Sequence, residues 1–469
     1  MDLPDFPWDS LAPAKERASS FVSSDPAQGE GIVDLSVGTP VDSTPEVVQT
    51  ALREAADAPG YPQTWGTADL REGIAGWFER RRGAPGVDPD GVLPTVGSKE
   101  LVAWLPTLMG LGAGDTVAFP RVAYPTYDVG ARIAGATPFA ADATTAFGPT
   151  TSTTAPRLLW LNTPSNPTGK VLGVEHLAKV VAWARERGVV VASDECYAEL
   201  DWREGAGSPG NLTAPSILDD RVCGGDHTGL LSVYSLSKQS SLAGYRASFV
   251  AGAPAIVKQL VDVRKHAGMI VPWPVQRVLK TAVEDDAHVA AQKAIYARRR
   301  AALKPALEAA AWRIDDSEAG LYLWATQGRP CRESIDALAE LGERRVPCGN
   351  EHVERVFALR CRDRRETLVR RRRQVLVGVH RHVAAVLHGA GGGADAGLDE
   401  VAGLAVDLAG AQVGDLAGAQ GGQAGVADAH AAAGGRGDAG LLGHHEQRHV
   451  AGSVHFDVGV LEHHAAAGP

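Results

Sequence analysis

The stretch "SVYSLSKQSSLAGYRASFV", residues 232–250, places one lysine among small, hydroxylated and apolar neighbours. Lys238 follows Ser235 and Ser237 closely, and Arg246 comes eight positions after it. A surface lysine needs no such surroundings. A lysine that bonds covalently to an anionic cofactor does need such surroundings, because the anion requires cationic and hydroxyl partners nearby. The stretch therefore raises the hypothesis of a cofactor lysine, which the rest of the chain has to support or oppose.

The overall composition is typical of a globular enzyme in the cytoplasm. The 469 residues are enough for a large core and two domains, with 44% hydrophobic and 22% charged residues. A net charge of −10 argues against general nucleic-acid binding. No apolar run has the length of a membrane span, and the acidic "MDLPDFPWDS" at the N-terminus does not resemble a signal peptide. Five cysteines without metal-site spacing indicate reduced thiols and no metal.

Apolar β-branched segments alternate with amphipathic ones in the first two thirds of the chain. "RLLWLN" (157–162), "GVVVASDE" (188–195) and "LLSVYSLS" (230–237) predict buried parallel strands, and "GVEHLAKVVAWARERG" (173–188) predicts a helix between the first two. This alternation is typical of a doubly wound α/β sheet, in which ligands bind at the carboxyl ends of the strands. Residues that carry the chemistry are therefore expected just after these segments.

Polar side chains do follow each of these strands. Asn166 lies in "TPSNPTGK", Asp194 closes the apolar run in "SDECY", and Lys238 follows the third strand. Taken singly, Asn166 can be a turn residue, and Asp194 can be a helix cap or a buried partner for a cation. Because three successive strand ends each supply one such group, we favour a shared site.

Two upstream segments offer contacts for a flat, phosphorylated ligand. In "TVGSKELV" (95–102) a strand end and a glycine turn precede a helix start, where amides and Ser98 suit a phosphate, although serine is also a common helix cap. In "PRVAYPTYDVG" (120–130) Tyr124 is either a core residue or a ring that stacks on a flat cofactor.

The residues around Lys238 resemble the signature of the fold-type I, pyridoxal-phosphate-dependent aminotransferases. That family has a small residue three positions before its lysine, and Leu, Gly and Arg at four, six and eight positions after it. The matching residues are Ser235, Leu242, Gly244 and Arg246. Ser248 departs from the Gly or Ala that is usual there but is still small. The resemblance extends from about residue 6 to about residue 324.

A narrower resemblance concerns the actinobacterial type of N-succinyldiaminopimelate aminotransferase of lysine biosynthesis. It rests on the segments "FPWDSLAPAKERA", "IVDLSVGTPVDSTP", "YPQTWGTADLREGIAGWF" and "SLAGYRASF". It implies transamination of N-succinyl-L,L-diaminopimelate with 2-oxoglutarate and glutamate as the oxo- and amino-acid pair, in a homodimer. The motifs alone leave another fold-type I aminotransferase or a C–S lyase open. A DNA-binding regulator is disfavoured because only some thirty residues precede "DLSVGTP".

The resemblance also implies a fold with two domains. A mostly parallel, seven-stranded sheet between helices would form the large pyridoxal-phosphate domain, beside a smaller α+β domain. We expect an N-terminal arm and part of the small domain in residues 1–40, the large domain in 41–255, and an incomplete small domain in 256–340. Residues 341–469 form an anomalous tail.

The resemblance assigns the cofactor's ring to residues from three strand ends. Lys238 would bind the cofactor aldehyde covalently and then act as general base at the substrate's α carbon. Asp194 would pair with the pyridine nitrogen, and Tyr197 and Asn166 would hydrogen-bond the phenolate oxygen. Tyr124 would stack on the ring.

The phosphate and the substrate carboxylate would be held by other residues. The phosphate ligands implied are Arg246, Ser235, Ser98, the amide of Lys99 and, from a partner subunit, Tyr61. Gly38, in "SVGTP", would let the backbone close on the substrate's α-carboxylate, which Asn166 would also contact.

The composition changes abruptly near Leu341. All ten tryptophans, all eight tyrosines and the last lysine lie before residue 325, whereas eleven of the fifteen histidines lie after residue 350. Residues 389–469 have one aromatic residue, Phe456, which is too little apolar surface to offset the entropy of ordering. We therefore expect disorder from about Leu341 onward.

The same region lacks the arginine that grips the substrate carboxylate in this family. Arg355, in "HVERV", is the nearest candidate. One back-translation of "CRDRRETLVRRRRQ" (361–374), read one base later, gives Ala-Ala-Thr-Asp-Glu-Arg, as in the family's C-terminal segment. We interpret the tail as frameshifted, which leaves a pyridoxal-phosphate-binding protein with impaired catalysis as a further alternative.

Overall fold

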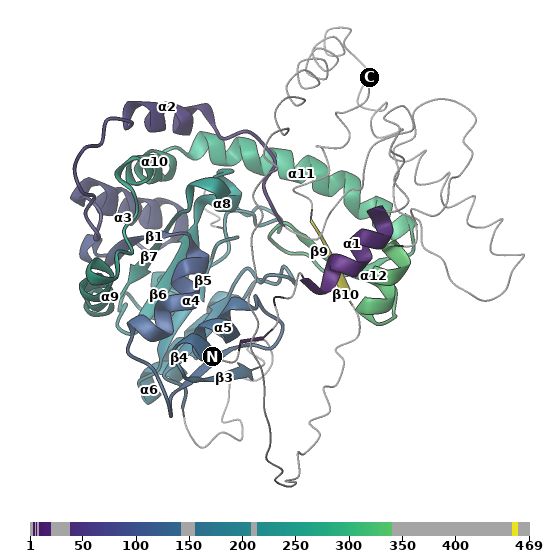
Figure 1. Cartoon of the computed structure of the whole chain (residues 1–469), viewed down its shortest axis with the longest axis horizontal. Coiled ribbons are helices and arrows are strands. Elements are labelled where there is room, and N and C mark those ends of the chain that lie inside the picture. Colours follow the sequence, from purple (N-terminus) through teal and green to yellow (C-terminus); the bar gives the residue numbers. More distant parts are fainter. Residues whose placement is uncertain are drawn as a thin grey trace, which may run out of the picture.

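A computed structural model of the chain describes residues 3–4, 6, 9–19, 38–141, 155–207, 213–339 and 453–457. Figure 1 shows a large sheet between helices, and a smaller unit beside it. The expectations for Arg355 and for the tail, other than residues 453–457, lie outside the described residues. None of the described helices is long and apolar enough to cross a membrane.

Seven strands form the large sheet, in the order β1-β7-β6-β5-β4-β2-β3. Their bounds are β1 (Val92–Val96), β2 (Thr116–Pro120), β3 (Thr137–Ala141), β4 (Leu158–Asn162), β5 (Val190–Asp194), β6 (Leu230–Ser235) and β7 (Ala247–Gly252). β7 runs antiparallel to both of its neighbours, β1 and β6, and the pairs among β6, β5, β4, β2 and β3 are all parallel. The predicted mostly parallel, seven-stranded sheet is confirmed, as are its three predicted strands.

Helices cover both faces of this sheet. One face carries α2 (Glu46–Glu54), α3 (Ala68–Arg82), α6 (Val174–Arg187) and α10 (Trp273–Glu284), and the other carries α4 (Ser98–Leu108), α5 (Thr126–Ile133) and α9 (Pro254–Ala267). Short helices lie in the connections: η3 (Pro89–Gly91), α7 (Asp220–Cys223), α8 (Leu236–Gln239) and η4 (Ala243–Tyr245). The helix predicted at 173–188 is α6, which ends at Gly188 because that residue takes the left-handed conformation, φ +63°.

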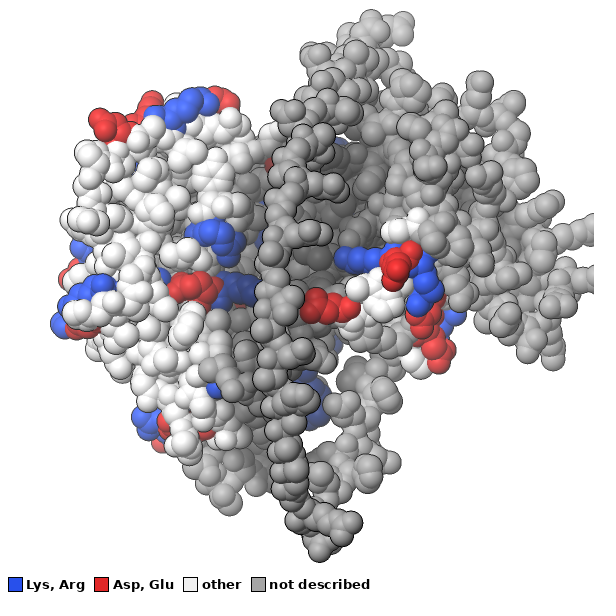
Figure 2. Space-filling model, in the orientation of Figure 1, with Lys and Arg blue, Asp and Glu red and all other residues white. Residues whose placement is uncertain are grey.

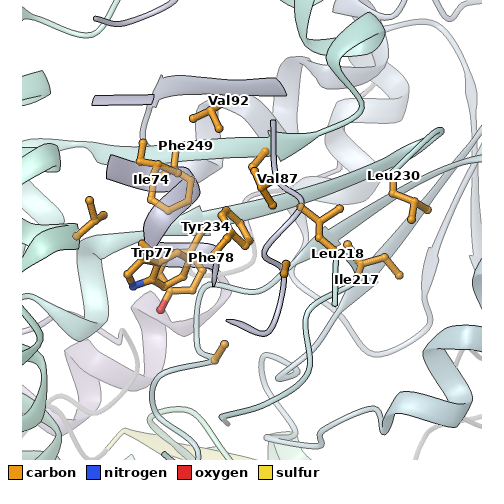
Figure 3. Packing of buried hydrophobic residues seen from close by; sticks show 14 of the residues in the cluster. Ile74, Trp77, Phe78, Val87, Val92, Ile217, Leu218, Leu230, Tyr234 and Phe249 are labelled. Atoms are coloured by element: carbon orange, nitrogen blue, oxygen red, sulfur yellow. The ribbon is translucent and has the colours of Figure 1, made fainter. Parts of the chain in front are cut away.

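Two apolar cores follow from the alternation of side chains along the strands. In β4, Leu159 and Leu161 point into the first core, and Leu158 and Trp160 into the second. Figure 3 shows the first core, where aromatic side chains of α3 pack against those of β6 and β7. The ring of Trp77 lies 4.6 Å from that of Tyr234 and 5.7 Å from that of Phe249.

The smaller unit contains α11 (Asp286–Ala309), β8 (Arg313–Asp316), β9 (Tyr322–Thr326) and α12 (Cys331–Ala339). On its outside, α1 (Ala12–Ser19), preceded by η1 (Asp9–Leu11), packs against α12, and Arg17 pairs with Asp336. Residues 453–457 form β10 (Ser453–Asp457), which pairs antiparallel with β9. One short segment of the anomalous tail therefore adds a strand to this unit.

The long helix α11 links the two units, and Figure 1 shows it running from the large sheet to the smaller one. α9 and α10 still belong to the large sheet, since Val257 and Leu260 lie in one of its cores and Val278 and Leu279 in the other. The packing thus places the change of unit at α11, whereas the sequence placed it near residue 255.

Figure 2 shows that the described charges of one face are mixed, with basic and acidic side chains side by side.

Candidate active site

The carboxyl ends of β4, β5 and β6 meet at one edge of the large sheet, beside the amino end of β7. Asn162 at the end of β4 is paired with Asp194 at the end of β5, and Asp194 with Val233 of β6. Ser235 at the end of β6 is paired with Ser248 near the start of β7. This register gathers the residues that follow the strands, as the alternation of strands and helices predicted.

Asp194 is buried, with 8% of its surface exposed, and has two hydrogen-bond partners. The Tyr127 hydroxyl donates to its Oδ2 at 2.9 Å, and the amide of Cys196 donates to its Oδ1 at 3.3 Å. The ring of Tyr127 is stacked on Trp160, with centroids 5.1 Å apart, which fixes its hydroxyl. Sequence reasoning missed Tyr127, and its position three residues after Tyr124 at the start of α5 was the only signal.

Burial raises the pKa of the Asp194 carboxyl, and the hydrogen bonds from Cys196 and Tyr127 oppose that rise. Burial and the charge of Asp194 also raise the pKa of the Cys196 thiol, while Ser98 and Lys238 lower it. The same thiol therefore lies within reach of three residues that the sequence assigned to one site. A cation placed beside Asp194 would offset the cost of burying its charge.

The N-terminus of α4 forms a cradle with Arg246. Gly97 is the cap residue, has φ +79°, and no side chain caps the helix. A Cβ on Gly97 would lie 2.0 Å from Nη2 of Arg246, so the guanidinium lies directly against this backbone. Arg246 is exposed, donates to the Ala243 carbonyl at 2.9 Å, and forms no ion pair with any described residue. Helix amides beside a guanidinium without a carboxylate partner form an anion site.

Two serines are paired across the neighbouring strands β6 and β7. The Ser235 hydroxyl is buried and hydrogen-bonds that of Ser237 at 2.9 Å. Ser248, where the family has Gly or Ala, donates to the Thr95 carbonyl at 3.1 Å and so ties β7 to β1. The small side chain of Ser248 is therefore accommodated without loss of the pairing between β7 and β1.

Two aromatic rings flank the ammonium group of Lys99 beside the cradle. Its Nζ lies 5.9 Å from the centre of the Tyr124 ring and 5.3 Å from that of Phe6. The rings of Tyr124 and Tyr127 are 6.2 Å apart. Tyr124 is thus half-buried between the α4 N-terminus and the partner of Asp194, where a flat ring could stack on it.

Lys238 is half-buried on α8, just after β6. Its Nζ donates to the carbonyl of Gly38, and its own carbonyl accepts from the Tyr296 hydroxyl at 3.1 Å. Gly38 therefore lies at the lysine amine, on the side where the resemblance places the substrate.

Asn162 fixes the loop that carries Asn166. Its Oδ1 accepts from the Asn166 amide at 2.7 Å, and its Nδ2 donates to the Asp194 carbonyl at 3.2 Å. The peptide bonds before Pro164 and Pro167 are cis. Asn162 thus joins two predicted site residues, a role that sequence reasoning missed.

The small unit also reaches the site. The Tyr197 hydroxyl lies 2.9 Å from that of Tyr322, the first residue of β9. From α11, Arg299 and Gln292 bind the carboxylate of Asp42, with Nη1 of Arg299 at 2.8 Å and Nε2 of Gln292 at 2.6 Å. The segment from Gly38 to Asp42 is therefore held against Lys238 by α11.

Tyr61 is the one predicted residue that the structure does not bring to this site within the described part of the chain. Its side chain is 103% exposed, in the loop between α2 and α3. Such exposure leaves it available to another subunit.

Residues 30–351 match the sequence profile of the family Aminotransferase class I and II. The chain belongs to the class I and II aminotransferases. It is 56% identical over 340 residues to the probable aminotransferase Rv1178 of Mycobacterium tuberculosis, covering 72% of this chain and 77% of that protein. It is 52% identical to the 4-dedimethylamino-4-oxo-anhydrotetracycline transaminase OxyQ of Streptomyces rimosus, covering 73% of this chain and 89% of that one.

More distant aminotransferases share the fold. The chain is 32% identical to the LL-diaminopimelate aminotransferase of Gloeobacter violaceus, over 71% of this chain and 87% of the relative. The crystal structure of an aminotransferase from Neisseria meningitidis superposes with a TM-score of 0.63 at 26% identity, over 72% of this chain and 86% of that one.

Class I and II aminotransferases use pyridoxal 5'-phosphate, and the residues present fit that cofactor. The cradle of Gly97 and Arg246 suits a phosphate, since a side chain at position 97 would fill it. The buried Asp194 suits a protonated ring nitrogen, because it has no cationic partner among the described residues. Lys238 supplies an amine just after β6, at the same edge of the sheet.

Proposed function

We propose that Lys238 is the cofactor lysine of an aminotransferase that acts on a diaminopimelate-type amino acid, with N-succinyl-L,L-diaminopimelate as amino donor and 2-oxoglutarate as acceptor. The observation that carries the chemistry is the arrangement at the sheet edge. An amine follows β6, a buried carboxylate ends β5, and a guanidinium lies at the helix N-terminus after β1.

In this proposal Arg246, the α4 amides, Ser98 and Ser235 hold the phosphate. Asp194, oriented by Tyr127, holds positive charge on the ring nitrogen. When bound, pyridoxal phosphate supplies an electron sink that stabilises negative charge at the substrate's α carbon.

Lys238 has two tasks. With the cofactor bound, its amine would hold the cofactor aldehyde and, as the free amine, Nζ would take the proton from the substrate's α carbon. The Gly38 carbonyl, which accepts from this amine, keeps Nζ on the substrate side. Tyr197 and Asn166 would donate to the cofactor's phenolate oxygen, and Asn166 would also contact the substrate carboxylate.

The substrate assignment draws on the segments that resemble N-succinyldiaminopimelate aminotransferases and on the LL-diaminopimelate aminotransferases among the relatives. A second candidate comes from the 52% identity to OxyQ, whose name describes a tetracycline ketone as substrate. The substrates of the two candidate functions differ in charge and in shape. The first is a flexible, carboxylate-rich amino acid, and the second is a flat polycyclic ketone.

A donor panel separates them. Purified protein loaded with pyridoxal phosphate is mixed in single turnovers with N-succinyl-L,L-diaminopimelate, LL-diaminopimelate, glutamate and a polycyclic amine, and formation of the aminated cofactor is followed by absorbance. The proposal expects the succinylated donor and glutamate to react fastest. If the polycyclic amine reacted faster than the succinylated donor and glutamate, the second candidate would be favoured. If no donor reacted, the protein would be one that binds the cofactor without catalysing transamination.

We further propose that residues from about 341 onward are read in a shifted frame. The profile match ends at residue 351, close to the change in composition. Resequencing codons 340–362 tests this directly. A one-base correction should restore an arginine-bearing C-terminal segment and raise transaminase activity, whereas an unchanged sequence with full activity would refute it.

We also propose a homodimer in which Tyr61 reaches the phosphate of the partner subunit. Mixed dimers of Tyr61→Ala and Lys238→Ala provide the test, because one of the two sites in such a dimer has both residues intact. Activity that returns on mixing would support shared sites, and no recovery in confirmed mixed dimers would refute them.

A further inference from the structure

Two tyrosine hydroxyls form a direct contact between the small unit and the candidate active site. Tyr197 follows β5 and Tyr322 begins β9, and their oxygens are 2.9 Å apart. Their rings meet edge to face, with centroids 5.7 Å apart and planes at 66°. Both side chains are buried, with 7% and 5% exposed, so water does not compete freely for the hydroxyls.

The strand that carries Tyr322 is held firmly against the loop that carries Tyr197. The amide of Gly320 donates to the Leu200 carbonyl at 2.8 Å, and the Trp202 indole donates back to the Gly320 carbonyl at 2.7 Å. Gly320 has φ +83°, and a Cβ there would lie 3.7 Å from the Tyr197 ring. These contacts fix the position of one hydroxyl relative to the other.

A phenol has one proton to donate and two lone pairs that accept. When one tyrosine of a pair donates to the other, the acceptor's own proton is left to point elsewhere. The order of donation therefore decides where the second proton is directed.

We propose that Tyr322 is a positioning residue for Tyr197: its hydroxyl donates to the Tyr197 oxygen and thereby directs the Tyr197 proton at the cofactor's phenolate oxygen. The inference rests on the proposed function of the site. It assigns to the small unit a part in cofactor binding that acts through Tyr197, by one hydroxyl of β9.

A double-mutant cycle on the full chain tests the pair, with the dissociation constant for pyridoxal phosphate and the visible spectrum of the borohydride-reducible complex as readouts. Tyr322→Phe loses one neutral hydrogen bond and should weaken binding about fivefold, whereas Tyr197→Phe loses the bond to the charged phenolate oxygen and should weaken it about tenfold or more. Tyr322→Phe should also shift the spectrum in the direction of Tyr197→Phe. The double variant should bind no more weakly than Tyr197→Phe.

Trp202→Phe is the matched control, because it removes a hydrogen bond that holds the same loop and leaves both hydroxyls in place. It should lower stability and leave the spectrum unchanged. The inference is overturned if Tyr322→Phe binds and absorbs like the parent, if the two tyrosine effects multiply independently, or if Trp202→Phe reproduces the spectral shift. A parent protein with no borohydride-reducible complex would overturn the proposed function, and this inference with it.

Discussion

Gly97→Ala tests the phosphate cradle by filling it with a single methyl group. The new Cβ would lie 2.0 Å from Nη2 and 2.6 Å from Cζ of Arg246, so the guanidinium has to move. Gly97 also has φ +79° and ψ 142°, a conformation that is nearly exclusive to glycine and costs a residue with a Cβ about 1–3 kcal/mol. The variant therefore loses some stability and loses the position of its main phosphate ligand.

The binding cost follows from the guanidinium alone. A hydrogen bond to a charged group contributes about 1.5–3 kcal/mol, so a displaced Arg246 should weaken pyridoxal phosphate binding by about 10- to 150-fold. The assay is a titration of the cofactor-free protein with pyridoxal phosphate, followed by fluorescence. Competition by inorganic phosphate should be weakened in the same variant.

Gly110→Ala is the matched control, at the other end of α4. Gly110 has a similar φ, +74°, but a Cβ there would meet nothing within 4 Å. It should cost similar stability without changing the affinity for the cofactor. Equal affinities in the Gly97→Ala and Gly110→Ala variants would refute the cradle.

Three further predictions concern Asp194 and α11. Burial raises the pKa of the Asp194 carboxyl, so the folded cofactor-free chain keeps this proton above pH 3.8, where the unfolded chain loses it. The free energy of unfolding therefore falls as the pH rises through the folded pKa. Asp194→Asn should remove this fall, measured by urea unfolding at a series of pH values. Tyr127→Phe removes a hydrogen bond to the carboxylate and should weaken cofactor binding about tenfold or more, measured by the same titration. Arg299→Met leaves the Asp42 carboxylate with the Gln292 amide but without a cation, and should lower the free energy of unfolding by about 3 kcal/mol, measured in urea.

Each of these has a result that would contradict it. A pH profile of stability that is the same in the parent and in Asp194→Asn would show that the carboxyl is not shifted by burial. Unchanged cofactor affinity in Tyr127→Phe would remove Tyr127 from the site. Arg53→Met breaks the exposed ion pair with Glu46 and should leave the free energy of unfolding unchanged. If Arg299→Met also left it unchanged, the stabilising role of the buried Arg299–Asp42 pair would be refuted.

The sheet and the strand-end residues could be predicted from sequence because both follow from local patterns. Apolar runs mark buried strands, and the carboxyl ends of parallel strands meet at one edge, so Asp194 and Lys238 belong together once the strands are found. The glycine turn before Ser98 predicted a candidate anion site for the same reason. These inferences need no knowledge of distant contacts.

The residues that orient the site could not be predicted, because their partners are far away in the chain. Tyr127 lies 67 residues from Asp194, and Tyr197 lies 125 residues from Tyr322. A buried tyrosine has the same local pattern whether it packs in a core or donates to a carboxylate. The packing of α9 against the large sheet could not be predicted for a related reason, since amphipathic helices do not reveal which sheet they cover.

The most direct test of the central claim is to locate the covalent bond to the cofactor. The protein is incubated with pyridoxal 5'-phosphate, reduced with borohydride and digested, and the modified peptide is identified by mass spectrometry. The account predicts one pyridoxyl group, on Lys238, and its loss together with the visible absorbance band in Lys238→Ala. A band that persists in Lys238→Ala, or modification mainly at another lysine such as Lys99, would contradict it.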